Sequence, residues 1–353
     1  EQQLDTLQGV RSIAVLDKLI SAEGELAFPS PPAAVLDIAG TATAQEVRLL
    51  SGKAVVKGEV RVQCAWRAEQ ETELQSLSTT LPFQQVLDVD GLSEDCRCLC
   101  VAEPVGFTLT EGEGEEPSRL TANLMLRLRA WRPYQLQCVA DAFSTKFETE
   151  QTPQTVQTES LACTLDKTVT LTGSGPLPDA GAKILACFAS FGPVSLTRGE
   201  GRAALTARAV VSAFAENTLG EIECDEKALD YALPLPADLS PDAQAYPECW
   251  LTVQDVQCTS AGGALEVSLT VRAEGAVLVR QTWPLVGGVE LGDPLAPADP
   301  EVSLRICYAQ AGEELFAIAK RYHVSPGQML AANDLPDGTE RLDEAQRLLV
   351  PGV

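Results

Sequence analysis

Alternating apolar and polar residues recur along most of the chain, and this period of two predicts β-strands with one buried face. The clearest segments are residues 54–66, 123–130 and 266–273. In the first of them, the residues expected on the buried face are Ala54, Val56, Val60, Val62, Cys64 and Trp66. Turn-forming pairs punctuate the strands at Ser51-Gly52, Asp90-Gly91 and Gly262-Gly263. No helical period lies between the strands, as parallel crossovers would require, so we expect antiparallel sandwiches or open barrels.

The chain also contains an internal repeat with a constant offset of 149 residues. Residues 33–66 match residues 182–215 at this offset. When short gaps are allowed, residues 81–95 also match residues 227–243. The matched positions include Val35 with Ile184, Leu36 with Leu185, Lys53 with Arg202, Val56 with Leu205 and Val62 with Val211. The repeat indicates two homologous β-domains.

The segments outside the repeat divide the chain further. Two of them lack a periodic apolar face and are predicted linkers, the first rich in Gln and Thr and the second rich in Pro. The N-terminal segment precedes the first repeat and could serve as a strand exchanged between copies. The predicted order is an N-terminal arm (1–30), a first β-domain (31–147), a linker (148–160), a second β-domain (161–291), a linker (292–302) and a C-terminal module (303–353).

The C-terminal module has a different pattern. Residues 303–310 read as a strand, and a helix follows with apolar residues at helical spacing. Ser325 is a suitable N-cap for a second helix that has Pro326 at its first position. Residues 348–351 close the module with a short apolar strand. We therefore expect a small α+β domain with the order strand, helix, helix, strand.

This module resembles a LysM domain. The residues that carry the resemblance are Gly312, Leu315, the IAKRYHVS run at 318–325, Leu330, Asn333, Leu335 and the LLVP run at 348–351. The resemblance implies a shallow groove for N-acetylglucosamine polymers, and the matching candidate residues are Gly312, Glu313, Glu314, Leu315, Asn333, Asp334 and Leu335.

Two departures from the LysM pattern bear on the ligand. The usual Asp-Thr pair is Glu313-Glu314 here, and the usual Gly before the last strand is Ala345. A bulkier, doubly acidic loop would change the shape of the groove and its hydrogen-bond donors. We interpret the module as a docking element for another envelope protein, with binding to peptidoglycan as the alternative.

The order of elements over nearly the whole chain is similar to that of the SPOCS-domain proteins of spore-forming Firmicutes. The segments that carry this resemblance are SGKAVVKGEVRV at 51–62 and LPFQQVLDVDGL at 81–92, followed by the LysM-like module. Family members are implicated in spore-envelope morphogenesis and in self-assembling outer layers such as spore coat and exosporium, and in at least one the LysM-type module docks a protein. The resemblance implies a homo-oligomeric filament or lattice in the spore envelope or at the cell surface, with the mother-cell cytoplasm as an alternative site of synthesis.

Charge and hydropathy exclude several classes of partner. The formal net charge of −24 argues against nucleic acid, because phosphate binding needs a basic surface. No apolar run approaches the roughly 18 residues that a membrane-spanning helix needs. The chain starts at Glu1 and its first Met is Met125, so we expect a removed leader or a numbering that begins inside the gene product.

Candidate catalytic and metal-binding residues are few, so we predict a protein that is not an enzyme and needs no cofactor or metal. His323 is the only histidine, and no GxSxG motif accompanies it. Residues 88–95 begin like a calcium loop but lack the third ligand and the Glu at position twelve. Paired carboxylates cannot be judged from spacing, so an envelope hydrolase stays a third hypothesis.

The eleven cysteines include an unusual CRCLC run, in which Cys96, Cys98 and Cys100 would share one face of a strand. One interpretation is a face of small buried apolar residues, because thiols are readily buried. The other is a set of cross-chain disulfides that lock an oligomer. Cys249 is the repeat partner of Cys100, which leaves Cys96 and Cys98 as the better candidates for cross-linking.

Overall fold

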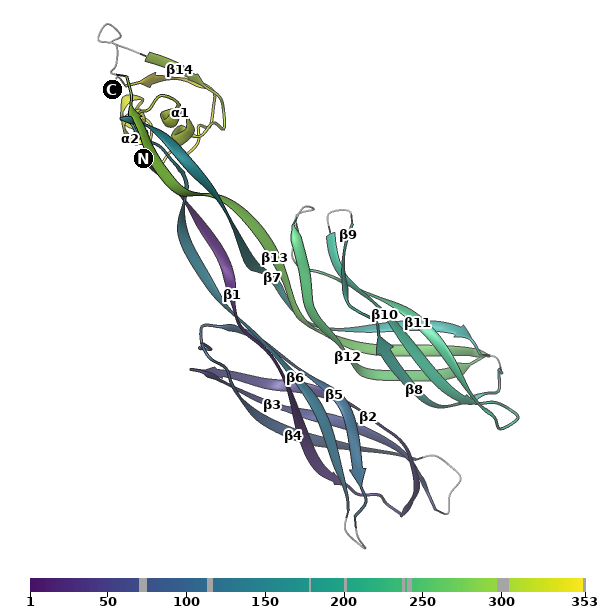
Figure 1. Ribbon diagram of the computed structural model, residues 1–353. Coiled ribbons are helices and arrows are strands. Elements are labelled where there is room, and N and C mark those ends of the chain that lie inside the picture. Colours follow the sequence, from purple (N-terminus) through teal and green to yellow (C-terminus); the bar gives the residue numbers. More distant parts are fainter. Residues whose placement is uncertain are drawn as a thin grey trace. The chain divides into compact units, whose positions relative to one another are not determined.

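The protein is mainly β, as the alternating pattern predicts (Figure 1). A computed structural model describes residues 1–69, 75–112, 117–177, 179–199, 202–236, 239, 243–296 and 305–351. Strands occupy most of this part of the chain, and two short helices lie in the C-terminal module.

The first repeat forms two three-stranded antiparallel sheets with the orders β2-β3-β4 and β1-β6-β5. Apolar residues of both sheets, among them Val60 of β3 and Leu126 of β6, contribute to one buried core. The repeat is therefore a β-sandwich. Its strands are β1 (Gln2–Leu26), β2 (Pro32–Leu50), β3 (Lys53–Ala68), β4 (Gln75–Asp88), β5 (Arg97–Thr110) and β6 (Ser118–Ala142).

The second repeat has the same arrangement, with the sheet orders β11-β10-β8 and β12-β13-β7 around a core of its own. A short extra strand, β9, pairs with β10. Its strands are β7 (Phe147–Pro176), β8 (Lys183–Phe191), β9 (Ser195–Gly199), β10 (Arg202–Glu216), β11 (Ile222–Pro234), β12 (Gln244–Ala261) and β13 (Ala264–Pro294). The prediction of two homologous antiparallel β-sandwiches is confirmed at the level of fold.

Strand β3 shows how the sequence pattern becomes a core. Every second residue from Ala54 to Ala68 is buried, including all six residues that the alternation assigns to the core face. Gly58 takes one of these positions, and a Cβ atom there would collide with Cζ of Phe83 and with the carbonyl oxygen of Thr43. Only glycine leaves room for this close approach of β2 and the Phe83 ring.

The contacts divide the described chain into two compact units. One unit comprises Gly9–Tyr134 and Glu159–Gln281 and contains both sandwiches. The other comprises Glu1–Gln8, Gln135–Thr158 and Thr282–Val353, so it contains the C-terminal module and the ends of β1, β6, β7 and β13. These four strands continue from one unit into the other.

Two segments differ from the expected irregular structure. Residues 148–160, the expected first linker, lie inside β7, and β1 occupies most of the expected N-terminal arm as an edge strand paired with β6. Threonine favours strands, and pairing with β13 supplies the hydrogen bonds, so β7 forms there without an apolar face. In the second expected linker, β13 extends to Pro294, and residues 297–302 lie outside the described part. The domain boundaries themselves stay predictions.

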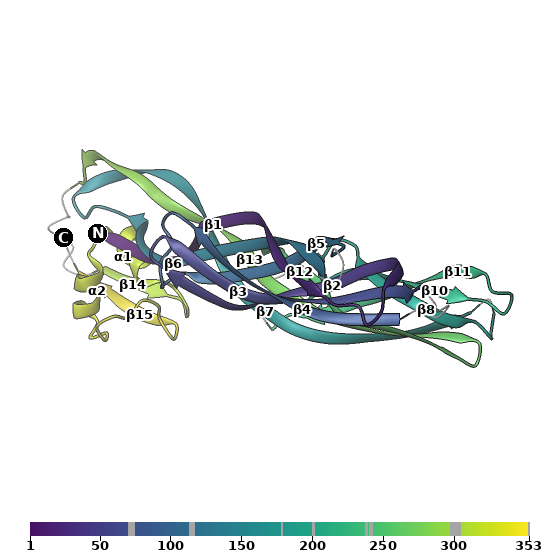
Figure 2. The same cartoon turned by 90° about the horizontal axis from the view of Figure 1, so that it is seen from below.

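The C-terminal module has the predicted order, β14 (Arg305–Ala309), α1 (Leu315–Arg321), α2 (Pro326–Ala332) and β15 (Gln346–Val350). Figure 2 shows these four elements gathered together. Ser325 caps α2 by accepting a hydrogen bond from the Gln328 N–H at 3.2 Å, and the Gln328 side chain closes the reciprocal half of the capping box. Ile318, Met329 and Leu348 are among the buried residues of the module's core.

Candidate functional site

The first half of the candidate groove, Gly312 to Leu315, is fixed by backbone hydrogen bonds to residues 340–342. Gly312 has a φ of +80°, which favours glycine, and its N–H donates to the Leu342 carbonyl at 2.7 Å. The Leu342 N–H donates to the Glu313 carbonyl at 3.1 Å, and the Leu315 N–H donates to the Glu340 carbonyl at 2.9 Å. Leu315 itself is buried in the core of the module. This half of the groove is therefore a rigid turn.

The two carboxylates that depart from the LysM pattern are both engaged by arginines. Glu313 accepts hydrogen bonds from the Gln310 N–H at 3.0 Å and from Arg321 at 2.6 Å. The Gln310 N–H, followed by Arg321, holds the pKa of Glu313 below its usual value. Glu314 pairs with Arg341. The acidic loop consequently presents ion pairs at the surface, with its carboxylate charges already matched within the module.

The second half of the groove begins with Asn333, whose side chain is used by the fold itself. Its Nδ2 donates to the carbonyls of Met329 at 2.9 Å and Leu349 at 2.8 Å, and its Oδ1 accepts from the Leu349 N–H at 2.6 Å. Asp334 is exposed and has a φ of +51°, and the Leu335 N–H then donates to the Leu330 carbonyl at 3.1 Å. The sequence-predicted residues of this half mainly close α2 against β15.

Within the described residues, the hydrogen bonds join each half of the groove to other parts of the module and not to each other. Gly312–Leu315 bond to residues 340–342, whereas Asn333 bonds to Leu349. The ligand-binding role of the seven candidate residues stays a prediction.

Sequence reasoning missed an apolar surface on the outer face of the two-stranded sheet. Ile306 is 44% exposed, Tyr308 is 79% exposed and Leu349 is 37% exposed. The strand register places Ile306 opposite Leu349 and Tyr308 opposite Arg347, so these four residues share one face, which we call the β14–β15 outer face. The alternation in β14 could have revealed this face. Cys307 and Ala309 are buried, so the residues that alternate with them, Ile306 and Tyr308, point outward.

The module also contacts the end of β6 and the turn that follows it, which lie in the same unit. Lys320 Nζ pairs with Asp141 at 2.5 Å, and His323 Nδ1 lies 3.2 Å from the Ser144 carbonyl oxygen. Phe143 and Phe316 pack edge to face, with ring centroids 5.2 Å apart. Burial raises the pKa of Asp141, but hydrogen bonds from Lys320 and Gln151 outweigh it and leave the pKa below its usual value. His323 therefore lies at a packing contact between the helices and this turn.

All eleven cysteines are free thiols in the structure, and the CRCLC run lies largely inside the first sandwich. Cys96 and Cys100 are buried and Cys98 is half-buried. Burial raises the pKa of Cys98 and of Cys100 to about 12, so both thiols stay protonated near neutral pH. This environment suits small buried residues, and an intermolecular bond at Cys100 would require the sandwich to open. Cross-linking by Cys96, Cys98 and Cys100 stays a prediction.

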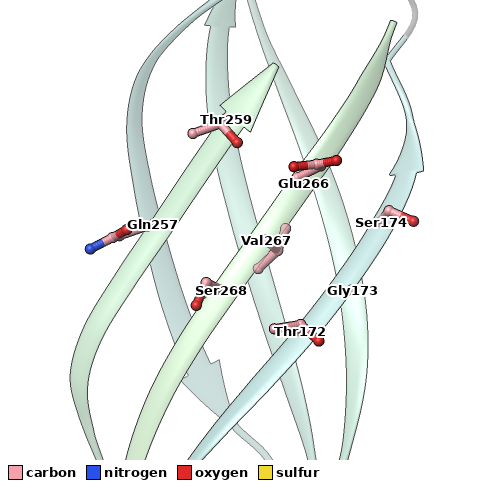
Figure 3. A pocket seen from close by; sticks show the side chains of 8 residues that line it. All are labelled: Thr172, Gly173, Ser174, Gln257, Thr259, Glu266, Val267 and Ser268. Carbon is pink, nitrogen blue, oxygen red and sulfur yellow. The ribbon is translucent and has the colours of Figure 1, made fainter. Parts of the chain in front are cut away.

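A polar groove of about 410 Å³ runs over the outer face of the second sandwich (Figure 3). Its polar side chains are four hydroxyls and one amide, and Glu266 is the one carboxylate among the lining residues. A glycosidase needs two carboxyl groups facing each other, so this groove offers no support for the hydrolase hypothesis. The lining residues are Thr172, Gly173 and Ser174 of β7, Gln257 and Thr259 of β12, and Glu266, Val267 and Ser268 of β13.

Comparisons with known protein families match two parts of the chain. Residues 33–107 match the model of the SipL, SPOCS domain, and residues 309–351 match the model of the LysM domain. No curated protein and no solved structure matches the chain. Both resemblances seen in the sequence are thereby confirmed.

These domain types are non-catalytic binding or structural modules, and a LysM domain supports binding of peptidoglycan or a related glycan. Together they indicate a spore-associated or cell-wall protein. Among the described residues, none of the helices has the length and apolar character that a bilayer crossing would need.

Proposed function

We propose that this chain, which joins a SPOCS domain to a LysM domain, is a non-enzymatic structural protein of the spore or cell envelope that self-associates into a filament or lattice. The observation that carries the proposal is the length of its edge strands. β1 has 25 residues and β7 has 30, and each lies at the edge of a three-stranded sheet. Strands in globular proteins usually have about 3–10 residues. A long edge presents a row of unpaired backbone groups to which another chain can bind.

The side chains of β1 add to this support. Val15 is 68% exposed and Leu19 is 59% exposed, so the edge strand carries large apolar groups into solvent. Soluble proteins usually protect such edges with charged residues or proline. Charged residues such as Arg11 and Lys18 lie on β1 as well, and Asp17, between Val15 and Leu19, is engaged in an ion pair with Arg129 at 2.7 Å. We therefore place a self-association surface along β1.

The LysM module acts in this proposal as a docking element for another envelope protein. Aromatic and aliphatic residues are typical of the buried centre of protein interfaces, and the β14–β15 outer face offers Ile306, Tyr308 and Leu349 together. The carboxylates Glu313 and Glu314 of the candidate groove are paired with arginines of the same module. Binding of another protein to this module requires only that the β14–β15 outer face is uncovered.

Self-association is tested by sedimentation velocity and negative-stain electron microscopy of the full chain over a range of concentrations. We expect ordered assemblies of the wild type, and a loss of at least tenfold in the assembled fraction when Val15→Lys and Leu19→Lys place charges on the β1 edge. Leu219→Lys is the matched control, because Leu219 is 82% exposed in a turn between β10 and β11. Monomers of the wild type at every concentration would rule the proposal out.

The second candidate is a peptidoglycan-binding adaptor, which the LysM match itself favours. It is tested by co-sedimentation of the full chain with insoluble peptidoglycan and with chitin. Under the docking proposal the same amount of wild type pellets with and without the glycan. The adaptor is favoured if the wild type pellets strongly with the glycan, if Glu314→Thr changes the amount that pellets and if Tyr308→Ser does not. Of these two residues, Glu314 lies in the candidate groove and Tyr308 does not.

A further inference from the structure

We propose that Cys187 and Cys258 form an intramolecular disulfide that joins the two sheets of the second sandwich, with a small-molecule disulfide as oxidant. Cys187 lies on β8, which is an edge strand of one sheet, and Cys258 lies on β12, an edge strand of the other. β8 and β12 are in contact across the sandwich.

The strand registers show that both thiols point into the space between the sheets. Cys187 is paired with Ala213, which is fully buried, and Cys258 is paired with Val267, which is also buried. Directly opposed residues of an antiparallel pair project to the same face. Both cysteines accordingly pack against the core of the second sandwich while staying half-buried.

The Cys187 side chain also reaches the segment of β12 that carries Cys258. Sγ of Cys187 donates to the carbonyl oxygen of Val256 at 3.5 Å, and Val256 is two residues before Cys258. Besides burial, the neighbouring Cys187 thiol raises the pKa of Cys258, as expected for two groups that lie near each other. A disulfide needs two side chains that approach each other and point toward each other. Both cysteines project into the same space between the sheets, and the Cys187 thiol reaches the backbone two residues before Cys258.

The first sandwich supplies an independent observation. Ile38 occupies the place of Cys187, because its partner Cys64 corresponds to Ala213 at the same offset of 149 residues. Leu109 occupies the place of Cys258 at that offset and is paired with the buried Leu120. Aliphatic side chains therefore suffice at both positions for packing. In the second sandwich both positions carry a cysteine, one on each sheet.

The reaction balances as two thiol–disulfide exchanges. One protein thiol loses its proton and attacks a sulfur of oxidised glutathione, which forms a mixed disulfide and releases one glutathione thiol. The second protein thiol loses its proton and attacks the protein sulfur of the mixed disulfide, which releases the second glutathione. The protein loses two electrons and two protons, and the oxidant takes them up as two thiols. Because burial raises the pKa of Cys258 to about 12, the exchange should accelerate as the pH rises.

The test uses the full chain, incubated with oxidised glutathione at pH 8 and then alkylated, digested without reductant and mapped by mass spectrometry. We expect a linked peptide that contains Cys187 and Cys258. We also expect the Tm to rise by about 5 to 15 °C, because the bond restrains the unfolded chain, and the rise to be reversed by dithiothreitol.

The matched control copies the first sandwich, with Cys187→Ile and Cys258→Leu in one chain. It should fold, and the oxidant should leave its Tm unchanged. Glutathione adducts without a linked peptide, or a linked peptide that joins either cysteine to a different one, would overturn the proposal. The same digest reports any bond at Cys96, Cys98 or Cys100 separately.

Discussion

Asn333 is a motif residue whose side chain bonds to the backbone of its own module. The LysM-like pattern marks it as a candidate for the groove, and this could be read from the sequence. Its hydrogen bonds with Leu349 could not be predicted from the sequence, because they depend on how β15 returns to the end of α2. The same holds for Glu313 and Glu314, whose arginine partners come from α1 and from the segment before β15.

Replacement of Asn333 tests its structural role. Asn333→Ala removes three hydrogen bonds at once, and at about 0.5–1.5 kcal/mol each we expect a loss of about 2–3 kcal/mol in the free energy of unfolding of the module. Urea unfolding of the full chain, followed by hydrogen exchange of the backbone amides of α1 and α2, measures it. Asp337→Ala, at an exposed turn position, is the control and should change little. Equal stability of both variants would contradict the assignment.

The pair of Asp141 and Lys320 predicts a pH dependence. The pKa of Asp141 in the folded protein is below its ordinary value of 3.8, so its ion pair contributes stability above that value. This contribution is lost as the pH falls from 3.8 through the lower folded pKa. We expect Asp141→Asn to lower the Tm of the unit that contains the C-terminal module at pH 7, and the difference from wild type to shrink as the pH falls below 3.8.

Differential scanning calorimetry from pH 2.5 to 7 measures this difference. The control is Glu148→Gln, which removes a carboxylate on β7. Among the described residues, Glu148 forms no ion pair. A difference that persists undiminished at pH 2.5 would show that the ion pair is not its source.

At the scale of elements, strands with one buried face could be predicted and strands without one could not. The alternation in β3 assigned its core residues correctly, because each apolar side chain is buried by the opposite sheet. Residues 148–160 carry no such pattern, since β7 is held there by backbone pairing with β13. Hydrogen bonding between distant segments leaves no period in the sequence.

Gly58 gives a prediction for the packing of these elements. A methyl group there would collide with β2 and with the Phe83 ring, so Gly58→Ala should destabilise the first sandwich by about 1–3 kcal/mol through overpacking. Guanidinium unfolding of the full chain measures the loss. Gly106→Ala is the matched control, because a Cβ atom on this β5 glycine would meet no atom within 4 Å. A loss as large in the control would point to backbone effects of glycine replacement instead.

At the scale of the molecule, the tandem repeat and the C-terminal module were predictable, because each leaves a signature of many residues. The thiol pair of the second sandwich was not. Cys187 and Cys258 are far apart in the sequence, and only the registers of β8 with β10 and of β12 with β13 bring their faces together. The CRCLC run is conspicuous in the sequence, but its thiols lie largely buried inside the first sandwich.

The four strands that pass between the two units have a mechanical consequence. A pull on a docked LysM module would reach the sandwiches by two routes, through the backbone of β13 and through the contacts of α1 with the turn between β6 and β7. β6 and β13 are the central strands of their sheets, so the load would be shared over the neighbouring strands. An envelope component anchored through this module would therefore behave as a tether that transmits tension into its β-sheets.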